Sequence, residues 1–111
     1  MQNGPNEYVV RVEHARRRAV SAPHLEWSER VLLAAAEAAD SCVAPAVRAE
    51  VACVIADKAG VALREMETLR GVRFVITDAV ASAGLADRVP AHVVTRVLWR
   101  LVFDLWGGPD R

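Results

Sequence analysis

Residues 31–40 read VLLAAAEAAD, and this alanine-rich stretch decides the fold. Alanine has the highest intrinsic helix propensity, and its small side chain lets two helix backbones approach closely. The stretch therefore predicts the middle of a long helix, which we place from about Ala22 to Cys42. Ser21 is positioned to cap the start of that helix, and Pro23 fits its first turn. Polar residues form a strip along this helix, and apolar residues lie on both sides of that strip. This arrangement indicates that the helix contacts neighbouring elements on two sides.

Apolar residues recur at helical spacing on either side of this segment as well. Gly60, Gly71 and Gly84 are placed where each could end a helix. Residues 8–12 and 72–77 are rich in β-branched and aromatic side chains, so a short strand remains an alternative at both places. The helices expected from this pattern cover residues 7–20, 22–42, 45–60, 62–70, 72–83 and 90–106.

The pattern predicts an all-α protein, a compact bundle of five to six helices. The length of 111 residues fits one domain with one hydrophobic core. We expect residues 1–6 to form a flexible tail and residues 7–111 to form the single helical domain. Hydrophobic residues make up 53% of the chain, but most are Ala and Val, so close helix contact must build the core.

Charge and hydropathy narrow the classes of partner. The 14 basic and 14 acidic residues give a formal net charge of zero, so no global field attracts nucleic acid or an anionic membrane. Lys58 is the only lysine, and we interpret this preference for Arg as the codon bias of a bacterial, high-GC genome. The chain has no apolar run of the length of a membrane span, and its start lacks the pattern of a secretory signal. A cytoplasmic protein is the expectation.

The residues that most often carry chemistry are few and scattered. The two cysteines lie in Ala/Val-rich helical context, which favours reduced, buried thiols; a disulfide or a reactive thiol is the alternative. The histidines have no short-range spacing of the metal-binding type, and the chain has no phosphate-binding loop, nucleophile elbow or Cys-x-x-Cys motif. We therefore expect no catalytic, cofactor or metal site, although these five residues could converge in space: His14, His24, Cys42, Cys53 and His92.

The last helix carries an aromatic second face. Trp99, Phe103 and Trp106 follow at i, i+4 and i+7, on the side that also holds His92 and Arg96. The opposite side forms the core contact through Val93, Val94, Val97, Leu98, Leu101 and Leu105.

Three aromatic side chains of about 150–250 Å² each exceed what a monomer normally leaves exposed. Either the chain's own first or second helix covers this face, or the face is an interface with another molecule. In the second case Trp and Arg are the usual anchors of the contact, and the predicted interface comprises His92, Arg96, Trp99, Phe103 and Trp106.

Residues 52–71, ACVIADKAGVALREMETLRG, resemble the helix-turn-helix of bacterial DNA-binding proteins. Ala56 is small enough for two helices to cross closely, and Gly60 would allow the sharp turn. The resemblance implies a second helix in the major groove, with Arg64, Thr68 and Arg70 contacting DNA. The neighbouring carboxylates of residues 65 and 67 are unfavourable beside phosphates.

These observations predict a non-enzymatic protein that acts through protein–protein contacts, as a homo-oligomer or an adaptor, by the aromatic face of its last helix. The alternative is a helix-turn-helix transcriptional regulator that binds DNA. No cofactor and no membrane partner are expected.

Overall fold

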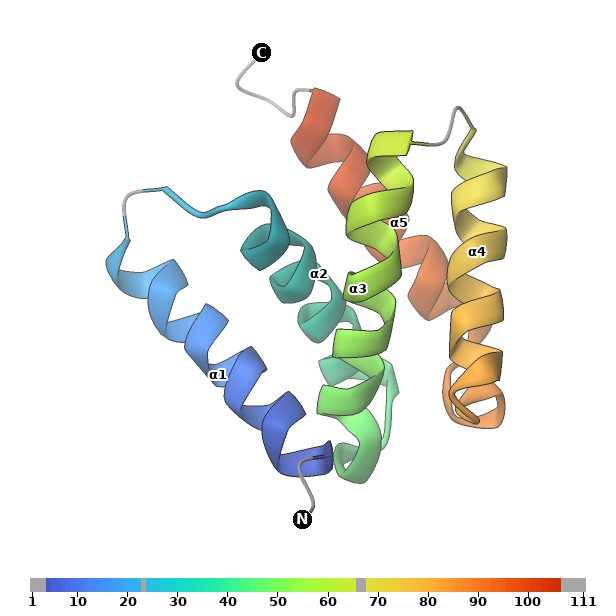
Figure 1. Cartoon of the computed structure of the whole chain (residues 1–111), viewed down its shortest axis with the longest axis horizontal. Helices are drawn as coiled ribbons and strands as arrows, with labels where there is room; N and C mark the ends of the chain where they lie inside the picture. Colours follow the sequence, from blue (N-terminus) through green and yellow to red (C-terminus); the bar gives the residue numbers. More distant parts are fainter. Residues whose placement is uncertain (1–3, 23, 66–67, 107–111) are drawn as a thin grey trace.

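The computed structural model describes residues 4–22, 24–65 and 68–106, and the side chains of residues 7–22, 24–65 and 68–103. These ranges contain no strand, so the prediction of an all-α bundle is confirmed, and residues 8–12 and 72–77 are both helical. The helices are α1 (Gly4–Ser21), α2 (Trp27–Cys42), α3 (Arg48–Glu65), α4 (Leu69–Ser82) and α5 (Ala91–Trp106), with short 3-10 turns η1 (Pro45–Val47) and η2 (Ala86–Arg88) (Figure 1).

Helices α2 and α3 form the central pair of the bundle. Helix α1 packs against both, α4 lies beside α3, and α5 contacts α2 and α4 (Figure 1). The predicted two-sided helix at residues 31–40 is therefore confirmed, because α2 has α1 and α3 on one part of its surface and α5 on another.

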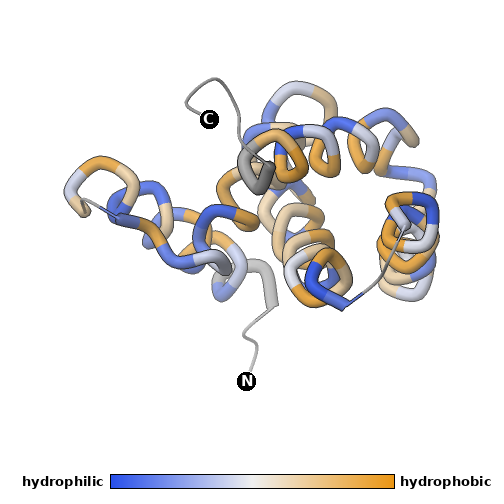
Figure 2. The backbone as a smooth tube through the Cα atoms, turned by 90° about the horizontal axis from the view of Figure 1, so that it is seen from above, coloured by the Kyte–Doolittle hydropathy of each residue, from blue (hydrophilic) through white to orange (hydrophobic). Residues whose placement is uncertain are grey.

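The core is built from small side chains. Along every helix hydrophobic positions recur between hydrophilic ones (Figure 2). Alanines occupy most of the buried contact between α2 and α3, which lets the two backbones approach closely. Larger side chains complete the core, and those that are almost fully buried are Val31, Val51, Ile55, Val72, Ile76, Val93, Val97 and Leu101.

The boundary between α1 and α2 differs from the prediction. Ser21 is the last residue of α1 rather than the cap of α2, and its hydroxyl donates to the Arg17 carbonyl at 3.1 Å. Helix α2 begins at Trp27, five residues later than expected, with Glu26 as its N-cap residue. Pro23 lies outside the described residues. At the other end, α1 already includes Gly4, so residues 4–6 belong to this helix.

Glu29 explains why α2 starts where it does. Its carboxylate accepts from the Glu26 backbone N–H at 3.1 Å and from Arg18 Nε of α1 at 2.9 Å. The first contact satisfies a backbone donor at the helix start, and the second ties α1 to α2. The Arg18 guanidinium, followed by the Glu26 N–H, holds the pKa of Glu29 below its ordinary value.

This lowered pKa predicts a pH-dependent stability. A carboxylate whose folded pKa is depressed stabilises the fold above its unfolded pKa of about 4.3, and that contribution is lost as the pH falls through the folded pKa. We expect Glu29→Gln to remove part of the stability seen at neutral pH and to flatten the acid limb of the stability curve. Urea unfolding across the acid range checks this. Arg18→Gln should reproduce the flattening, and an acid limb unchanged in both variants would contradict the assignment.

Two glycines that were expected to end helices lie inside them. Helix α3 runs through Gly60, because Ala59 and Ala62 continue its buried side and the Trp27 indole N–H donates to the Gly60 carbonyl at 3.1 Å. The tertiary contacts outweigh the cost of about 1 kcal/mol for glycine in a helix. Helix α4 likewise includes Gly71, in its first turn. The structure therefore has two helices, α3 and α4, where three were predicted at residues 45–60, 62–70 and 72–83.

Thr68 sets the start of α4 and supplies a stability prediction. It has extended backbone angles, and its Oγ1 accepts from the Gly71 N–H at 3.1 Å. Thr68→Ala leaves this N–H without its partner and should destabilise the protein by about 1 kcal/mol. Urea unfolding measures the change. Thr77→Ala, at an exposed position within the same helix, is the matched control and should have little effect; equal losses in the two variants would contradict the capping role.

The expected break at Gly84 is confirmed. Gly84 adopts a φ of +76°, a conformation that side chains disfavour. The Gly84 N–H donates to Ala81 O and the Leu85 N–H to Val80 O, both at 3.0 Å, which is the hydrogen-bond pattern of a Schellman motif. Leu85 is buried directly after the turn, so the chain is directed back across the core towards α5.

Candidate interaction surface

Helix α5 presents two different faces. Its inner face is buried, with Val93, Val97 and Leu101 inaccessible to solvent, as predicted. On the outer face the side chain of Trp99 is 63% exposed and that of Phe103 is 55% exposed. Neither α1 nor α2 covers these two rings, so the alternative in which the chain buries them itself is wrong. Trp106 is the last residue of α5, and its side chain lies outside the described residues.

We call Trp99 and Phe103, with His92 and Arg96 on the same side of the helix, the aromatic face. His92 and Arg96 are exposed, as expected for an interface. Large apolar side chains at exposed positions indicate a binding surface when they lie together rather than singly.

Arginines flank the aromatic face. On the side of α2, Arg100 Nη1 donates to the Glu37 carboxylate. On the side of α4, Arg70 and Arg73 line a hollow of about 180 Å³ together with Leu98 and Trp99. A polar and charged rim around an apolar centre is the usual anatomy of a protein–protein interface.

The residues predicted to contact DNA have other roles in the fold. The Arg64 guanidinium lies over the Trp27 ring, 5.7 Å from its centroid, and the Thr68 hydroxyl caps α4. All three residues are exposed, and Arg70 also borders the hollow beside Trp99. The turn required by a helix-turn-helix is also not at Gly60, since α3 is continuous there and α3 and α4 run side by side as a hairpin (Figure 1).

The basic cluster at residues 16–18 is likewise engaged within the chain. Arg16 pairs with Asp40 of α2 at 2.8 Å, and Arg18 pairs with Glu29. Arg17 lies 3.6 Å from Glu13, one turn earlier in α1. The first two pairs connect α1 to α2, and each of the three arginines has a carboxylate partner.

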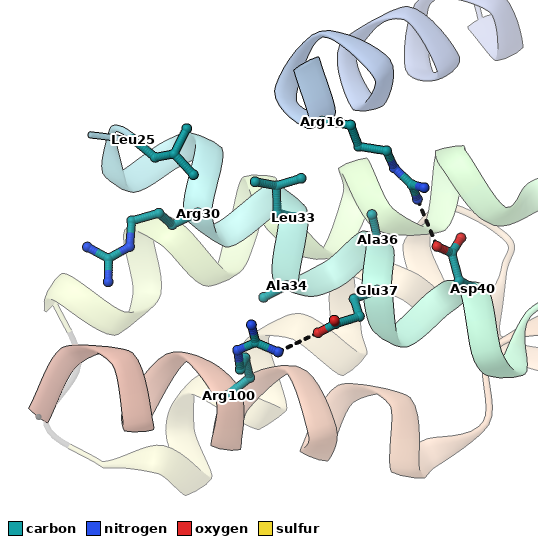
Figure 3. A pocket seen from close by; sticks show the side chains of 9 residues that line it. All are labelled: Arg16, Leu25, Arg30, Leu33, Ala34, Ala36, Glu37, Asp40 and Arg100. Atoms are coloured by element: carbon teal, nitrogen blue, oxygen red, sulfur yellow. Dashed lines mark hydrogen bonds and ion pairs between the residues drawn. The ribbon is translucent and has the colours of Figure 1, made fainter. Parts of the chain in front are cut away.

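A cavity beside α2 is bordered by two ion pairs that each connect α2 to another helix. It measures about 390 Å³ and lies where α1, α2 and α5 meet. Arg16 with Asp40 and Arg100 with Glu37 stand at its edges, and short apolar side chains such as Ala34 lie between them (Figure 3). Each of the two carboxylates at this cavity is thus paired with an arginine.

The structure brings together one pair that the sequence only allowed in principle. Cys42 ends α2 and His92 lies in the first turn of α5, and the distance from Cys42 Sγ to His92 Nε2 is 3.1 Å. Arg96 Nη1 lies 4.0 Å from the same sulfur. The two residues are 50 positions apart, and no spacing in the sequence signals their contact. Cys42 is partly exposed, so the expectation of a buried thiol holds for Cys53 alone.

Sequence reasoning also missed Phe74. It is 73% exposed on α4, on the side opposite the buried stripe of Val72, Ile76 and Val80. The helical period from Val72 could have revealed this, because position 74 falls between the core positions. A single exposed ring needs no functional explanation.

Among the described residues, no three His, Cys, Asp and Glu side chains could together hold a metal ion, and no helix has the length and apolar character to cross a membrane. Comparison with protein-family models, curated proteins and solved structures gives no match for this chain.

Proposed function

We propose that this chain is a non-enzymatic interaction protein that assembles with a second copy of itself through the aromatic face of α5. The observation that carries the proposal is the exposure of Trp99 and Phe103 on one side of a helix whose other side is fully buried. Tryptophan and arginine are the side chains that most often dominate the binding energy of an interface. Each Å² of apolar surface that a partner covers on this face contributes about 25 cal/mol to the free energy of binding.

A second copy fits because the order of residues on this face is self-complementary. In an antiparallel pair of α5 helices with Trp99 opposite Phe103 of the other copy, position 96 falls opposite position 106. Arg96 of each copy then faces a tryptophan position of the other, where a guanidinium over an indole ring is favourable. A two-fold interface requires this kind of reciprocal match, in which residue i contacts residue j and j contacts i.

The expected size of the contact also supports a pair. Stable interfaces bury about 600–1,000 Å² on each partner. Aromatic side chains of about 150–250 Å² each supply a large part of this area from one helix, and the flanking residues of α2 and α4 supply the rest. The interface would therefore be of modest size, with an affinity that depends on the tryptophan.

DNA binding, the alternative predicted from residues 52–71, gains no support from the positions of Arg64 and Thr68, which are both engaged within the fold. We therefore do not extend the proposal to nucleic acid.

Capture between two differently marked copies tests the proposal. A tagged chain is mixed with an untagged chain, equilibrated and retrieved by its tag. Retention of untagged chain, lost when both copies carry Phe103→Ala and kept when both carry Phe74→Ala, is the expected result. Failure to retain the untagged wild-type chain at high micromolar concentration would exclude self-association, and the aromatic face would then need a partner of different sequence.

A further inference from the structure

Cys42 differs from an ordinary structural cysteine in its neighbours. Its sulfur lies 3.1 Å from His92 Nε2 and 4.0 Å from Arg96 Nη1. When Nε2 is unprotonated the thiol can donate to it, and when Nε2 is protonated it can donate to the thiolate. A nucleophile within hydrogen-bond reach of a base is the arrangement that activates a thiol.

Accessibility separates the two cysteines of the chain. Cys42 is partly exposed at the end of α2, and both His92 and Arg96 are exposed beside it. Cys53 is buried in α3, and its Sγ lies 3.8 Å from the Tyr8 carbonyl oxygen. Burial also raises the pKa of the Cys53 thiol, which keeps it in the unreactive form. Cys53 therefore serves as an internal control for the thiol reactivity of Cys42.

We propose that Cys42, His92 and Arg96 form a site of covalent thiol modification that reacts with small disulfides. His92 takes the Cys42 proton as the sulfur attacks one sulfur of the incoming disulfide. The bond between Cys42 and that sulfur forms as the original disulfide bond breaks, and the departing thiolate takes the proton from His92. Cys42 is oxidised to a mixed disulfide, and the other half of the reagent is reduced to a thiol.

The charged groups around the sulfur are consistent with this role. From α5 the groups that contact it are His92 and Arg96. On its own helix, the nearest carboxylate along the chain is Asp40, which is held by Arg16 of α1 and faces Arg48 at 3.9 Å. A thiolate at Cys42 therefore meets cationic or donor groups from α5 on its exposed side.

An aromatic disulfide that releases a coloured thiol, 5,5′-dithiobis-(2-nitrobenzoate), tests the site in the folded protein. We expect one fast-reacting thiol in the chain, absent in Cys42→Ser and retained in Cys53→Ser. His92→Gln should slow the reaction near neutral pH by about tenfold or more, at the low end of what a positioned base contributes. This difference should shrink in alkaline solution, where hydroxide removes the thiol proton without help. Arg96→Gln should slow it to a smaller degree.

The outcome is separable from the proposed self-association. Because His92 and Arg96 also belong to the aromatic face, the rates are compared at a protein concentration low enough for the wild-type chain to be a single copy. There Trp99→Ala, which leaves Cys42 and its neighbours in place, should react at the wild-type rate. Two results would overturn the proposal: a folded-state rate at Cys42 no higher than that of the fully unfolded chain in urea, or a rate that His92→Gln leaves unchanged at every pH.

Discussion

Trp99→Ala is expected to weaken self-association by at least about 2 kcal/mol, the threshold of an interface hot spot. At 1.4 kcal/mol for each factor of ten, this raises the dissociation constant by roughly thirtyfold. The physical reason is that the indole is 63% exposed in the single chain and lies at the centre of the aromatic face. A partner can therefore remove most of its surface from water. Sedimentation equilibrium of the wild type and the variant measures the two constants.

The fold itself should be nearly unaffected by Trp99→Ala, because an exposed side chain contributes little to the stability of the single chain. Substitutions at such positions usually change stability by no more than about 0.5 kcal/mol. Phe74→Ala is the matched control, since Phe74 is a more exposed aromatic on a different helix. Equal dissociation constants for the wild type and both variants would exclude α5 as the interface.

Ile55→Ala is expected to produce the largest loss of folding stability, about 2–5 kcal/mol. Ile55 is completely buried in α3, where alanines of α2 and α3 surround much of the contact between the two helices. Alanine side chains cannot reach into the space that the substitution leaves, so the cavity should persist rather than collapse. Cavities that do not collapse cost the most.

Urea unfolding measures this loss, with the slope of the transition as a check that the unfolded state is unchanged. Ile55→Val removes one methylene and should cost only about 0.5–1.5 kcal/mol. The proposed interface is on another helix, so a dimer of the folded Ile55→Val chain should have the wild-type dissociation constant. A loss for Ile55→Ala as small as that for Ile55→Val would contradict the rigid, alanine-lined core.

The parts of the fold that the sequence predicted are those in which one local signal acts alone. In α5 the period of Val93, Val97 and Leu101 has no competing pattern, and the two faces are as expected. At Gly84 the left-handed turn needs only a residue without a side chain, and the helix ends there.

The wrong predictions are those in which a distant contact overrides a local signal. Gly60 would end a helix on its own, but the Trp27 indole, 33 positions away, donates to its carbonyl. Ser21 is a good cap by type, yet Glu29 with Arg18 sets the start of α2 further along the chain. In both places the deciding interaction joins two helices, which periodicity along one helix cannot reveal.

The two candidate sites differ in the same respect, because one follows from a local pattern and the other from a distant contact. The placement of Trp99 and Phe103 opposite the core side of α5 followed from their spacing on one helix, but that spacing left open whether another helix covers the two rings. The contact between Cys42 and His92 depends on how the end of α2 meets the start of α5. How the two helix ends meet is a property of the packed bundle. The sequence could therefore identify both residues but could not predict that they are in contact.

The most direct test of the proposed self-association is the solution mass of the unmodified wild-type chain, measured by multi-angle light scattering over a wide concentration series. The chain has a mass of 12.1 kDa. We predict that the measured mass rises with concentration to a plateau at twice that value. A mass that stays at 12.1 kDa up to the highest concentration would contradict the pairing of two copies through α5.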